Sequence, residues 1–250
     1  MSLENKIAIV TGGSRDIGRA VSEGLAAQGA RVVVNYFNNA SEGEATVAAI
    51  KSAGGEAIAV RGDMTRQADV DNLVAETRQR FGDTIDVLVN VAGGLVARKT
   101  LAEMDEEFFE YVMKLNVTST FLTVKAVVPH MGPGGTIVNF SSQAGRDGGG
   151  PGAIAYAASK GAVMTLTRGL AKELGPSNIR VNCVCPGMIS TTFHDTFTKD
   201  EVRANVAAAT PLRREGQAKE VADLVVFLAS ENSGFMTGVN VDINGGMVVS

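Results

Sequence analysis

The fold is decided by residues 6–36, KIAIVTGGSRDIGRAVSEGLAAQGARVVVNY. The first apolar run, 6–11, has the uninterrupted Ile, Ala and Val residues that are typical of a buried parallel strand. A glycine-rich turn leads into an amphipathic helix, predicted over 17–28, and a second apolar strand closes the segment. This order predicts a βαβ unit, the repeating unit of doubly wound α/β sheets.

Three glycines, Gly12, Gly13 and Gly18, lie in the turn between the first strand and the helix. Glycines there let backbone amides approach a diphosphate, and the start of the helix supplies partial positive charge. A structural alternative stays open, because any strand-to-helix corner can require a glycine for its positive φ.

Strand-like runs recur along the rest of the chain, separated by helical patterns. They cover residues 56–60, 85–90, 136–140, 179–184 and 238–242. We therefore expect a doubly wound, mainly parallel, seven-stranded sheet with helices on both faces. Such sheets bind ligands beyond the carboxyl ends of their strands, and Asn90, Ser142 and Pro186 each follow such an end.

The composition is that of one globular domain. A chain of 250 residues with 45% hydrophobic content can bury one large core, and no break in composition suggests a linker. We expect a single domain over residues 1–250. No leader-like start and no stretch apolar enough for a membrane span is present, and a net charge of −4 argues against nucleic acid as the main partner. We expect a cytoplasmic protein.

The cysteines and histidines do not suggest a metal site. Cys183 and Cys185 lie two residues apart in a predicted strand, so both point to the same face. With only His130 and His194 to add, no tetrahedral ligand set is apparent. We interpret the cysteines as buried, inert thiols and expect no metal.

Tyr156 and Lys160 lie four residues apart in a predicted helix and therefore on one face of it. A free tyrosine has a pKa near 10 and is a poor base at neutral pH, but an adjacent cation favours the phenolate. The pair can move a proton. Alone, the spacing is a weak signal, because Tyr and Lys four residues apart are commonplace on solvated helices.

Taken together, the motifs resemble those of the short-chain dehydrogenase/reductase family over the whole chain. Within that family the sequence looks like the 3-oxoacyl-(acyl-carrier-protein) reductases and related sugar dehydrogenases. The matching residues are Thr11, Gly12 and Gly18 of T-G-x-x-x-x-x-G, Asn90, Ala92 and Gly93 of N-x-A-G, Asn116 of L-N-V, Ser141, Ser142 and Gly145 of S-S-x-x-G, Tyr156 and Lys160, the I-R-V-N stretch at 179–182, and Pro186 with Gly187. The resemblance implies a single-domain, Rossmann-like fold.

The resemblance also implies catalytic roles. Tyr156 would exchange a proton with the substrate oxygen, and Lys160 would ease that transfer and bind the nicotinamide ribose. Ser142 would hold the substrate oxygen, and Asn116 would position a water that leads to Lys160. Two alternatives stay open: Asn116 as a polar residue at a local helix kink, and Ser142 as a plain turn residue after a strand.

The family pattern further implies a set of cofactor contacts, mainly within residues 1–150. They are Gly12, Ser14, Arg15, Asp16, Ile17 and Gly18 in the turn, Asn35, Tyr36, Asp63, Met64, Asn90, Ala92 and Gly93 after later strands, Tyr156 and Lys160, and Pro186, Gly187, Ile189 and Thr191 of P-G-x-I-x-T. For Asp63, an Asx turn after the strand is the structural alternative.

The segment after the second strand favours NADP(H) over NAD(H). An NAD-selective enzyme usually carries an acidic residue there, but this chain has none from Asn35 to Asn39. Arg15 offers a guanidinium group to a 2′-phosphate. NAD(H) remains possible, because Glu42 or Glu44 could reach the ribose.

Three departures from the family pattern stand out. Asp16 occupies the position of a glycine in the turn, Val91 replaces an asparagine, and the loop between Ser142 and Tyr156 is one residue longer than in the acyl-carrier reductases. The segment of about 188–215 is interpreted as a substrate lid, or alternatively as a surface helix for oligomer contact.

We therefore expect an NADP(H)-dependent enzyme that interconverts a ketone and a secondary alcohol, with a 3-oxoacyl thioester as the leading small-molecule substrate. A sugar or sugar-acid dehydrogenase is the first alternative, and a non-catalytic dinucleotide-binding sensor is an alternative of another class. The resemblance implies a homotetramer.

Overall fold

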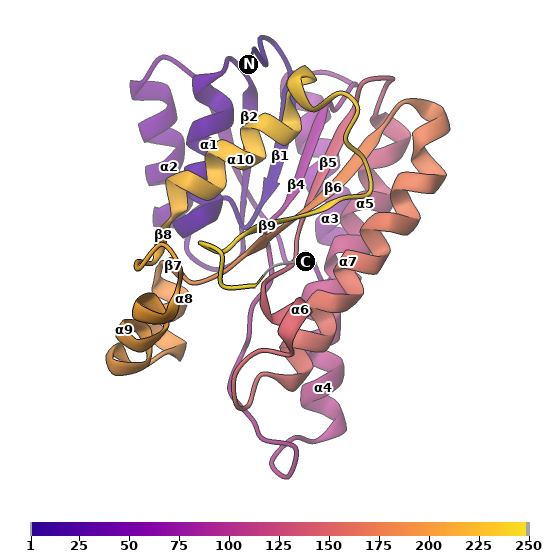
Figure 1. The fold of residues 1–250 in the computed structure, drawn as a ribbon. Helices are drawn as coiled ribbons and strands as arrows, with labels where there is room; N and C mark the ends of the chain where they lie inside the picture. The colour runs from indigo at the N-terminus through magenta and orange to yellow at the C-terminus, as the bar shows by residue number, and fades with distance from the viewer. Residues whose placement is uncertain (1, 249–250) are drawn as a thin grey trace.

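The computed structural model describes residues 2–248 of the chain. Its centre is a seven-stranded sheet in the order β3-β2-β1-β4-β5-β6-β9, in which each neighbouring pair is parallel (Figure 1). The strands are β1 (Ile7–Thr11), β2 (Arg31–Tyr36), β3 (Glu56–Arg61), β4 (Val87–Asn90), β5 (Thr136–Phe140), β6 (Arg180–Pro186) and β9 (Asn240–Ile243). The predicted fold class is confirmed.

Some strand ends differ from the predicted ones, for reasons that the backbone hydrogen bonds show. The fourth strand begins at Val87, because the N–H of Ile85 is donated to the carbonyl of His130 outside the sheet. The sixth continues to Pro186, which pairs with Ile243. The last begins at Asn240 and not at Gly238, whose φ of +75° departs from the extended conformation.

Alternation along the strands divides the core into two layers. Ala8 and Val10 of β1 face one apolar cluster, and Ile7 and Ile9 face the other. The first layer is covered by α1 (Asp16–Ala27), α2 (Ala40–Ser52) and α10 (Ala218–Ala229). The second is covered by α3 (Gln67–Phe81), α5 (Ser119–Val127) and α7 (Ile154–Leu174), as Figure 1 shows.

Short and irregular helices complete the chain. A π-helical turn, Lys114–Thr118, joins α4 (Glu106–Met113) to α5, and α6 (Ala144–Asp147) follows β5. Single 3₁₀ turns occur at Val128–His130, Gly175–Ser177 and Glu231–Ser233. Within helices, π-turns occur often at functional sites, and this one carries Asn116.

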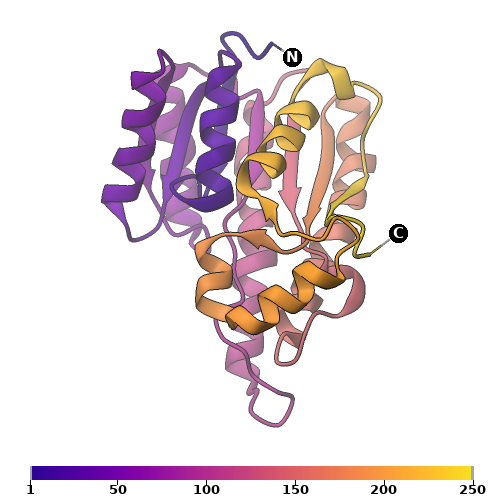
Figure 2. The same ribbon diagram turned by 60° about the vertical axis from the view of Figure 1, so that its left-hand side comes forward.

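The segment predicted as a lid forms a separate layer beyond the carboxyl ends of the strands (Figure 2). It contains β7 (Ile189–Ser190), α8 (Thr192–Phe197), α9 (Asp200–Ala209) and β8 (Gly216–Gln217). The strands β7 and β8 pair with each other in a small second sheet. In residues 2–248, no helix has the length and apolar character needed to cross a membrane.

Candidate active site

A cavity of about 670 Å³ lies at the carboxyl ends of the central strands. The loops that follow β1 to β6 all contribute to its wall, as sheets of this topology predict. Among the lining residues are Gly12 after β1, Phe37 after β2, Ala92 after β4, Ser142 after β5 and Gly187 after β6. The lid lines the cavity with residues of α8 and α9.

The glycine turn is held so tightly that two of its glycines cannot be replaced without movement. Gly12 has a φ of +62°, a region that side chains rarely adopt. A Cβ on Gly18 would lie 2.0 Å from the carbonyl oxygen of Gly12. Glycine is therefore required at these positions for structural reasons. Without a side chain at Gly18, the start of α1 packs directly against the turn that lines the cavity.

Tyr156 and Lys160 lie at the first turns of α7 and both line the cavity. Lys160 is only 5% exposed, and its Nζ donates a hydrogen bond of 2.9 Å to the carbonyl of Phe140. The same Nζ lies 5.6 Å from the centre of the Tyr156 ring. The sequence prediction that the two share a helix face is thus met in a buried setting and not on a solvated surface.

Burial changes the proton affinity of both groups. It lowers the pKa of Lys160 to about 8, because the ammonium loses its hydration. Burial also raises the pKa of Tyr156, and the nearby hydroxyl of Ser142 opposes this rise. The phenol therefore holds its proton at neutral pH in the protein alone, and the lysine charge is within reach of physiological titration.

Ser142 is brought to this place by close contact between α6 and α7. Its Oγ accepts a hydrogen bond of 3.1 Å from the N–H of Ala144. The neighbouring Ser141 donates from Oγ to the carbonyl of Lys160 at 2.7 Å. A Cβ on Gly145 would lie 2.9 Å from the N of Gly161, so a glycine is needed where the two helices meet. The bond from Ala144 is the one expected if Ser142 is a plain turn residue. The Ser142 hydroxyl also faces the cavity next to Tyr156.

Asn116 lies in the π-helical turn, behind the cavity wall. Its Oδ1 accepts from the N–H of Gly94 at 3.0 Å, and its Nδ2 donates to the carbonyl of Gly94 at 2.9 Å. A Cβ on Gly93 would lie 2.5 Å from Asn116 Oδ1 and 3.3 Å from Lys160 Nζ. Asn116 therefore holds the loop after β4 against the lysine.

Asn90, one of the expected cofactor contacts, has its side chain directed into the core. Asn90 is 3% exposed, its Nδ2 donates to Asn139 Oδ1 at 2.9 Å, and its Oδ1 accepts from Thr123 Oγ1 at 2.7 Å. These bonds tie it into the core, and the residues that follow it, including Ala92 and Gly93, line the cavity instead.

At the opposite end of the cavity, two of the expected cofactor contacts, Asn35 and Asp63, differ in burial and in hydrogen bonding. Asn35 is buried, and its side chain bridges the N–H of Gly12 at 3.1 Å and the carbonyl of Gly62 at 3.1 Å. Asp63 accepts from the N–H and Oγ1 of Thr65 at 2.9 and 2.7 Å, which is the Asx turn of the structural alternative, although the residue still lines the cavity.

Charged groups at this end are few. The side chain of Arg15 is 64% exposed and lines the cavity together with Tyr36 and Met64. Glu42, at the start of α2, is also in the wall. Its N–H is capped by the side chain of Asn39 at 3.3 Å. This end of the cavity therefore presents the guanidinium of Arg15 together with the carboxylates of Glu42 and Asp63.

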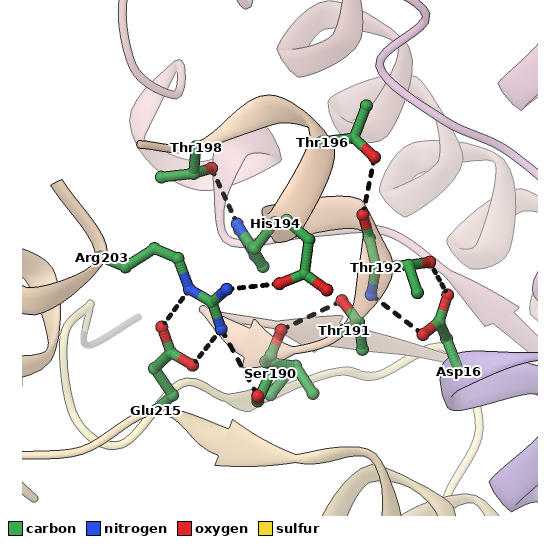
Figure 3. Close-up of polar contacts among 11 residues, drawn as sticks. Asp16, Ser190, Thr191, Thr192, His194, Thr196, Thr198, Arg203 and Glu215 are labelled. Atoms are coloured by element: carbon green, nitrogen blue, oxygen red, sulfur yellow. Dashed lines mark hydrogen bonds and ion pairs between the residues drawn. The ribbon is translucent and has the colours of Figure 1, made fainter. Parts of the chain in front are cut away.

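Asp16 is the first residue of α1 and has a φ of +50°. Its carboxylate does not point into open space. It accepts hydrogen bonds from the N–H and the Oγ1 of Thr192 in the lid, at 3.0 and 2.5 Å (Figure 3). The departure from the glycine pattern thus produces a direct contact between the turn and the lid.

Comparison with known proteins places this site in a family. A family model described as enoyl-(acyl carrier protein) reductase matches residues 12–248. A 3-oxoacyl-(acyl-carrier-protein) reductase from a Synechocystis species is 40% identical, with 99% of each chain covered. The chain belongs to the short-chain dehydrogenase/reductase family. An uncharacterized oxidoreductase of Methylorubrum extorquens is 39% identical over 98% of both chains.

Solved structures agree with this membership. A dehydrogenase/reductase from Sinorhizobium meliloti superposes with a TM-score of 0.94 at 36% identity and covers 99% of this chain and 97% of its own. A metagenomic blue fluorescent protein in complex with NADPH gives a TM-score of 0.93 at 34% identity, with both chains fully covered. This short-chain dehydrogenase/reductase is therefore an oxidoreductase that acts on a carbonyl or alcohol group.

Three residues around the reductase site carried no clear sequence signal. Phe193 of α8 places its ring centre 6.1 Å from that of Tyr156. Arg98 donates from Nε to the carbonyl of Phe197 and from Nη1 to that of Pro151, both at 2.9 Å. Leu95 is buried in the wall between them. No spacing rule links these loops, so only the folded chain reveals the contacts.

His194, which the sequence places in the lid, also lines the cavity of this reductase. Its Nδ1 lies 3.0 Å from Thr198 Oγ1, and its ring packs edge-on against Phe193. Burial lowers its pKa, since the cation would lose hydration there. The catalytic end thus combines apolar side chains such as Leu95 and Phe193 with the polar side chains of Ser142, Tyr156, Lys160 and His194. Both cysteines are buried and unpaired, as predicted.

Proposed function

We propose that this enzyme reduces a ketone to a secondary alcohol with NADP(H), using Tyr156 as the proton donor. One observation carries the proposal: the phenol of Tyr156, the hydroxyl of Ser142 and the amine of Lys160 meet at one end of a cavity whose other end reaches the glycine turn. A bound nicotinamide would supply the hydride, while the chain provides orientation and the proton.

The protein groups have distinct tasks in this reaction. Ser142 donates to the substrate oxygen and stabilises the negative charge that develops there. Tyr156 transfers its proton to the same oxygen. The Lys160 cation stabilises the phenolate that remains, because an opposite charge nearby favours the ionised form. Asn116 is a positioning residue that keeps the Gly93–Gly94 loop beside Lys160 and leads a water toward it.

The residues of the cavity fit a dinucleotide. The close approach that Gly12 and Gly18 permit leaves room for a diphosphate at the start of α1, with Ser14, Ile17 and the backbone around it. Pro186, Gly187, Ile189 and Thr191 face it from the other wall. We propose that these groups, and not the buried Asn90 side chain, hold the cofactor.

NADP(H) is the preferred form in this proposal. Arg15 is the exposed guanidinium at the β2 end, where a 2′-phosphate would add negative charge. The similarity to a structure in complex with NADPH supports this choice. Glu42 in the same wall is the group through which NAD(H) remains a weaker cofactor.

We propose a 3-oxoacyl thioester as the substrate. The curated relative of that name supports the choice, and so does the apolar surface that Leu95, Leu115, Val202 and Val206 give the catalytic end. NADPH oxidation, followed by absorbance, should be fastest with acetoacetyl thioesters and slower with keto sugars. Faster turnover of the sugars would reverse the substrate assignment, and NADPH binding without any turnover would indicate a sensor.

The assembly and location belong to the same proposal. We propose a cytoplasmic homotetramer of single-domain subunits, each covering residues 1–250 with the lid at about 188–215. Exposed aromatic side chains on α4 and α5, namely Phe109, Tyr111 and Phe121, support a subunit contact. Light scattering after size-exclusion chromatography would measure about four times the 26.0 kDa of one chain, and a monomer mass would reject this part.

A further inference from the structure

The contact between Asp16 and Thr192 joins two walls of the cavity. Asp16 lies between Arg15 and Ile17, which line the cavity from the glycine turn. Thr192 directly follows Thr191, which lines it from the lid. The bonds connect residues 176 positions apart in the chain. A ligand that reaches from Arg15 to Tyr156 therefore lies between two walls that this bridge connects.

The bridge also completes the lid helix α8. Thr192 is the first residue of α8, and the preceding residue makes no side-chain cap. The free N–H is satisfied by the Asp16 carboxylate from another part of the chain, as Figure 3 shows. At the other end of α8, Arg98 donates to the carbonyl of Phe197. The body of the protein thus holds α8 at both ends, with charges that match the helix dipole.

Inside the lid, Arg203 ties the parts together. Its guanidinium bonds to Glu215 at 2.7 Å twice and to Asp195 at 2.5 Å (Figure 3). Arg203 of α9 thus bonds both to α8 and to the segment before β8. If the Asp16–Thr192 bonds break, these parts of the lid should therefore move together.

We propose that Asp16 is a positioning residue that pins the lid closed and so controls the rate at which the cofactor is exchanged. The inference rests on the proposed function only for the identity of the cofactor. Asp16 has a positive φ of +50°, which Asp tolerates better than most side chains but which glycine adopts most readily. Here both of its oxygens are used on one lid residue.

The kinetic test alters each partner of the bridge, Asp16 and Thr192, in turn and measures how fast the cofactor is released. NADPH release is followed by stopped-flow fluorescence after displacement with excess NADP⁺. Thr192→Val loses the hydroxyl bond of the bridge and should speed release by about three- to tenfold, the factor that one lost bond predicts. Asp16→Gly loses both bonds of the bridge and should speed release at least as much. Their effects should not multiply in the double variant, because both remove the same contact.

Two further variants distinguish a specific effect of the Asp16–Thr192 bridge from a general loss of structure in α8. Thr192→Ser keeps the hydroxyl and should restore the native release rate. Thr196→Val removes a hydroxyl of the same helix that bonds within α8, to the carbonyl of Thr192, and should leave the rate unchanged. Native release by Thr192→Val, or multiplying effects of the two bridge variants, would overturn the proposal.

A second readout needs no cofactor. Hydrogen exchange of the α8 amides in the ligand-free protein should accelerate in Asp16→Gly, because the Thr192 N–H loses its acceptor. Unchanged exchange would show that no pin exists, whatever the cofactor is. If the unaltered protein shows no NADPH signal but exchange does accelerate, the cofactor assignment fails and the pin stands.

Discussion

Tyr156 and Tyr111 line the same cavity, and only Tyr156 lies beside Ser142 and Lys160. Tyr156→Phe removes the proton donor and leaves the ring in place. We expect turnover to fall by about 10²- to 10⁴-fold, the range of acid–base catalysis, with NADPH affinity nearly unchanged. Steady-state kinetics and fluorescence titration measure the two. Tyr111→Phe is the matched control and should keep native turnover; an active Tyr156→Phe enzyme would remove Tyr156 from the mechanism.

Lys160 predicts a pH dependence for the same step. Its pKa is about 8 in the folded protein, below the ordinary lysine value of 10.5, so the ammonium is lost as the pH rises through about 8. We expect kcat/KM for ketone reduction to fall over that interval, because the neutral amine cannot stabilise the phenolate. A profile that stays flat to pH 10 would contradict the assigned electrostatic role.

Arg15 carries the cofactor preference. Arg15→Ala should weaken NADPH binding by about tenfold or more and NADH binding much less, since a charged hydrogen bond to the 2′-phosphate is lost. Arg19→Ala is the control, because Arg19 pairs with Glu23 on the same helix and is not in the cavity wall. Isothermal titration with both cofactors measures the difference, and equal losses for NADPH and NADH would argue for a plain surface cation.

For single residues, the sequence predicts the relative positions of side chains well when those side chains lie on the same helix or strand. Tyr156 and Lys160 follow from helical spacing, and Ser142 from its place after a strand. Asn90 shows a limit of sequence patterns: nothing in the sequence indicates that its side chain bonds to Asn139 and Thr123 in the core. Phe193 reaches Tyr156 through folding of distant loops, which no local pattern encodes.

Among the elements, α1 and α7 show opposite uses of glycine. Gly18→Ala would place a Cβ 2.0 Å from the Gly12 carbonyl, so the start of α1 must move, and we expect a loss of about 1–3 kcal/mol in unfolding free energy. Gly169 lies exposed inside α7 with nothing within 4 Å of an added Cβ. Gly169→Ala should therefore stabilise by roughly 0.5–1 kcal/mol.

Urea denaturation of both glycine variants measures these changes. Opposite signs are the expected result, because both positions are helical and differ mainly in the space around them. A Gly18→Ala protein as stable as the unaltered chain would mean that the turn relaxes freely and does not fix the cavity wall.

Strands were easier to predict than irregular helices. The runs at 56–60 and 136–140 became β3 and β5 with little change, because their Ala, Ile, Val and Phe residues pack in the two core layers on either side of the sheet. The π-helical turn at Lys114–Thr118 has no such signature. It arises where Asn116 bonds to Gly94, a tertiary contact that outweighs regular helix geometry.

For the whole molecule, the buried Lys160 has a cost in stability. Its pKa falls from 10.5 to about 8 on folding, so the unfolded chain binds more protons and stability rises with pH between these values. Below pH 8 the penalty is complete, at about 3 kcal/mol. Lys160→Met should thus raise the unfolding free energy at pH 7 by about 2 kcal/mol, after the lost bond to Phe140 is subtracted.

The same variant should be inactive, which links stability to function. Its advantage should shrink from pH 8 to 10.5, because the native lysine is then neutral when folded. Chemical denaturation at pH 7 and pH 10 tests both points, and a Lys160→Met protein less stable at pH 7 would mean that the ammonium is well solvated by its surroundings.

The last strand of the sheet has a consequence for how the enzyme is made. β9 ends at Ile243, whose carbonyl accepts from Gly187, and the carbonyl of Gly245 accepts from Leu212 beside the lid. Chains grow from the N-terminus and begin to fold during synthesis. A ribosome stalled before residue 240 would therefore carry a nascent chain whose earlier strands can pair. The catalytic wall of that chain would still lack the hydrogen bonds that Ile243 and Gly245 accept. The catalytic wall can therefore form only after residues 240–245 have left the ribosomal tunnel.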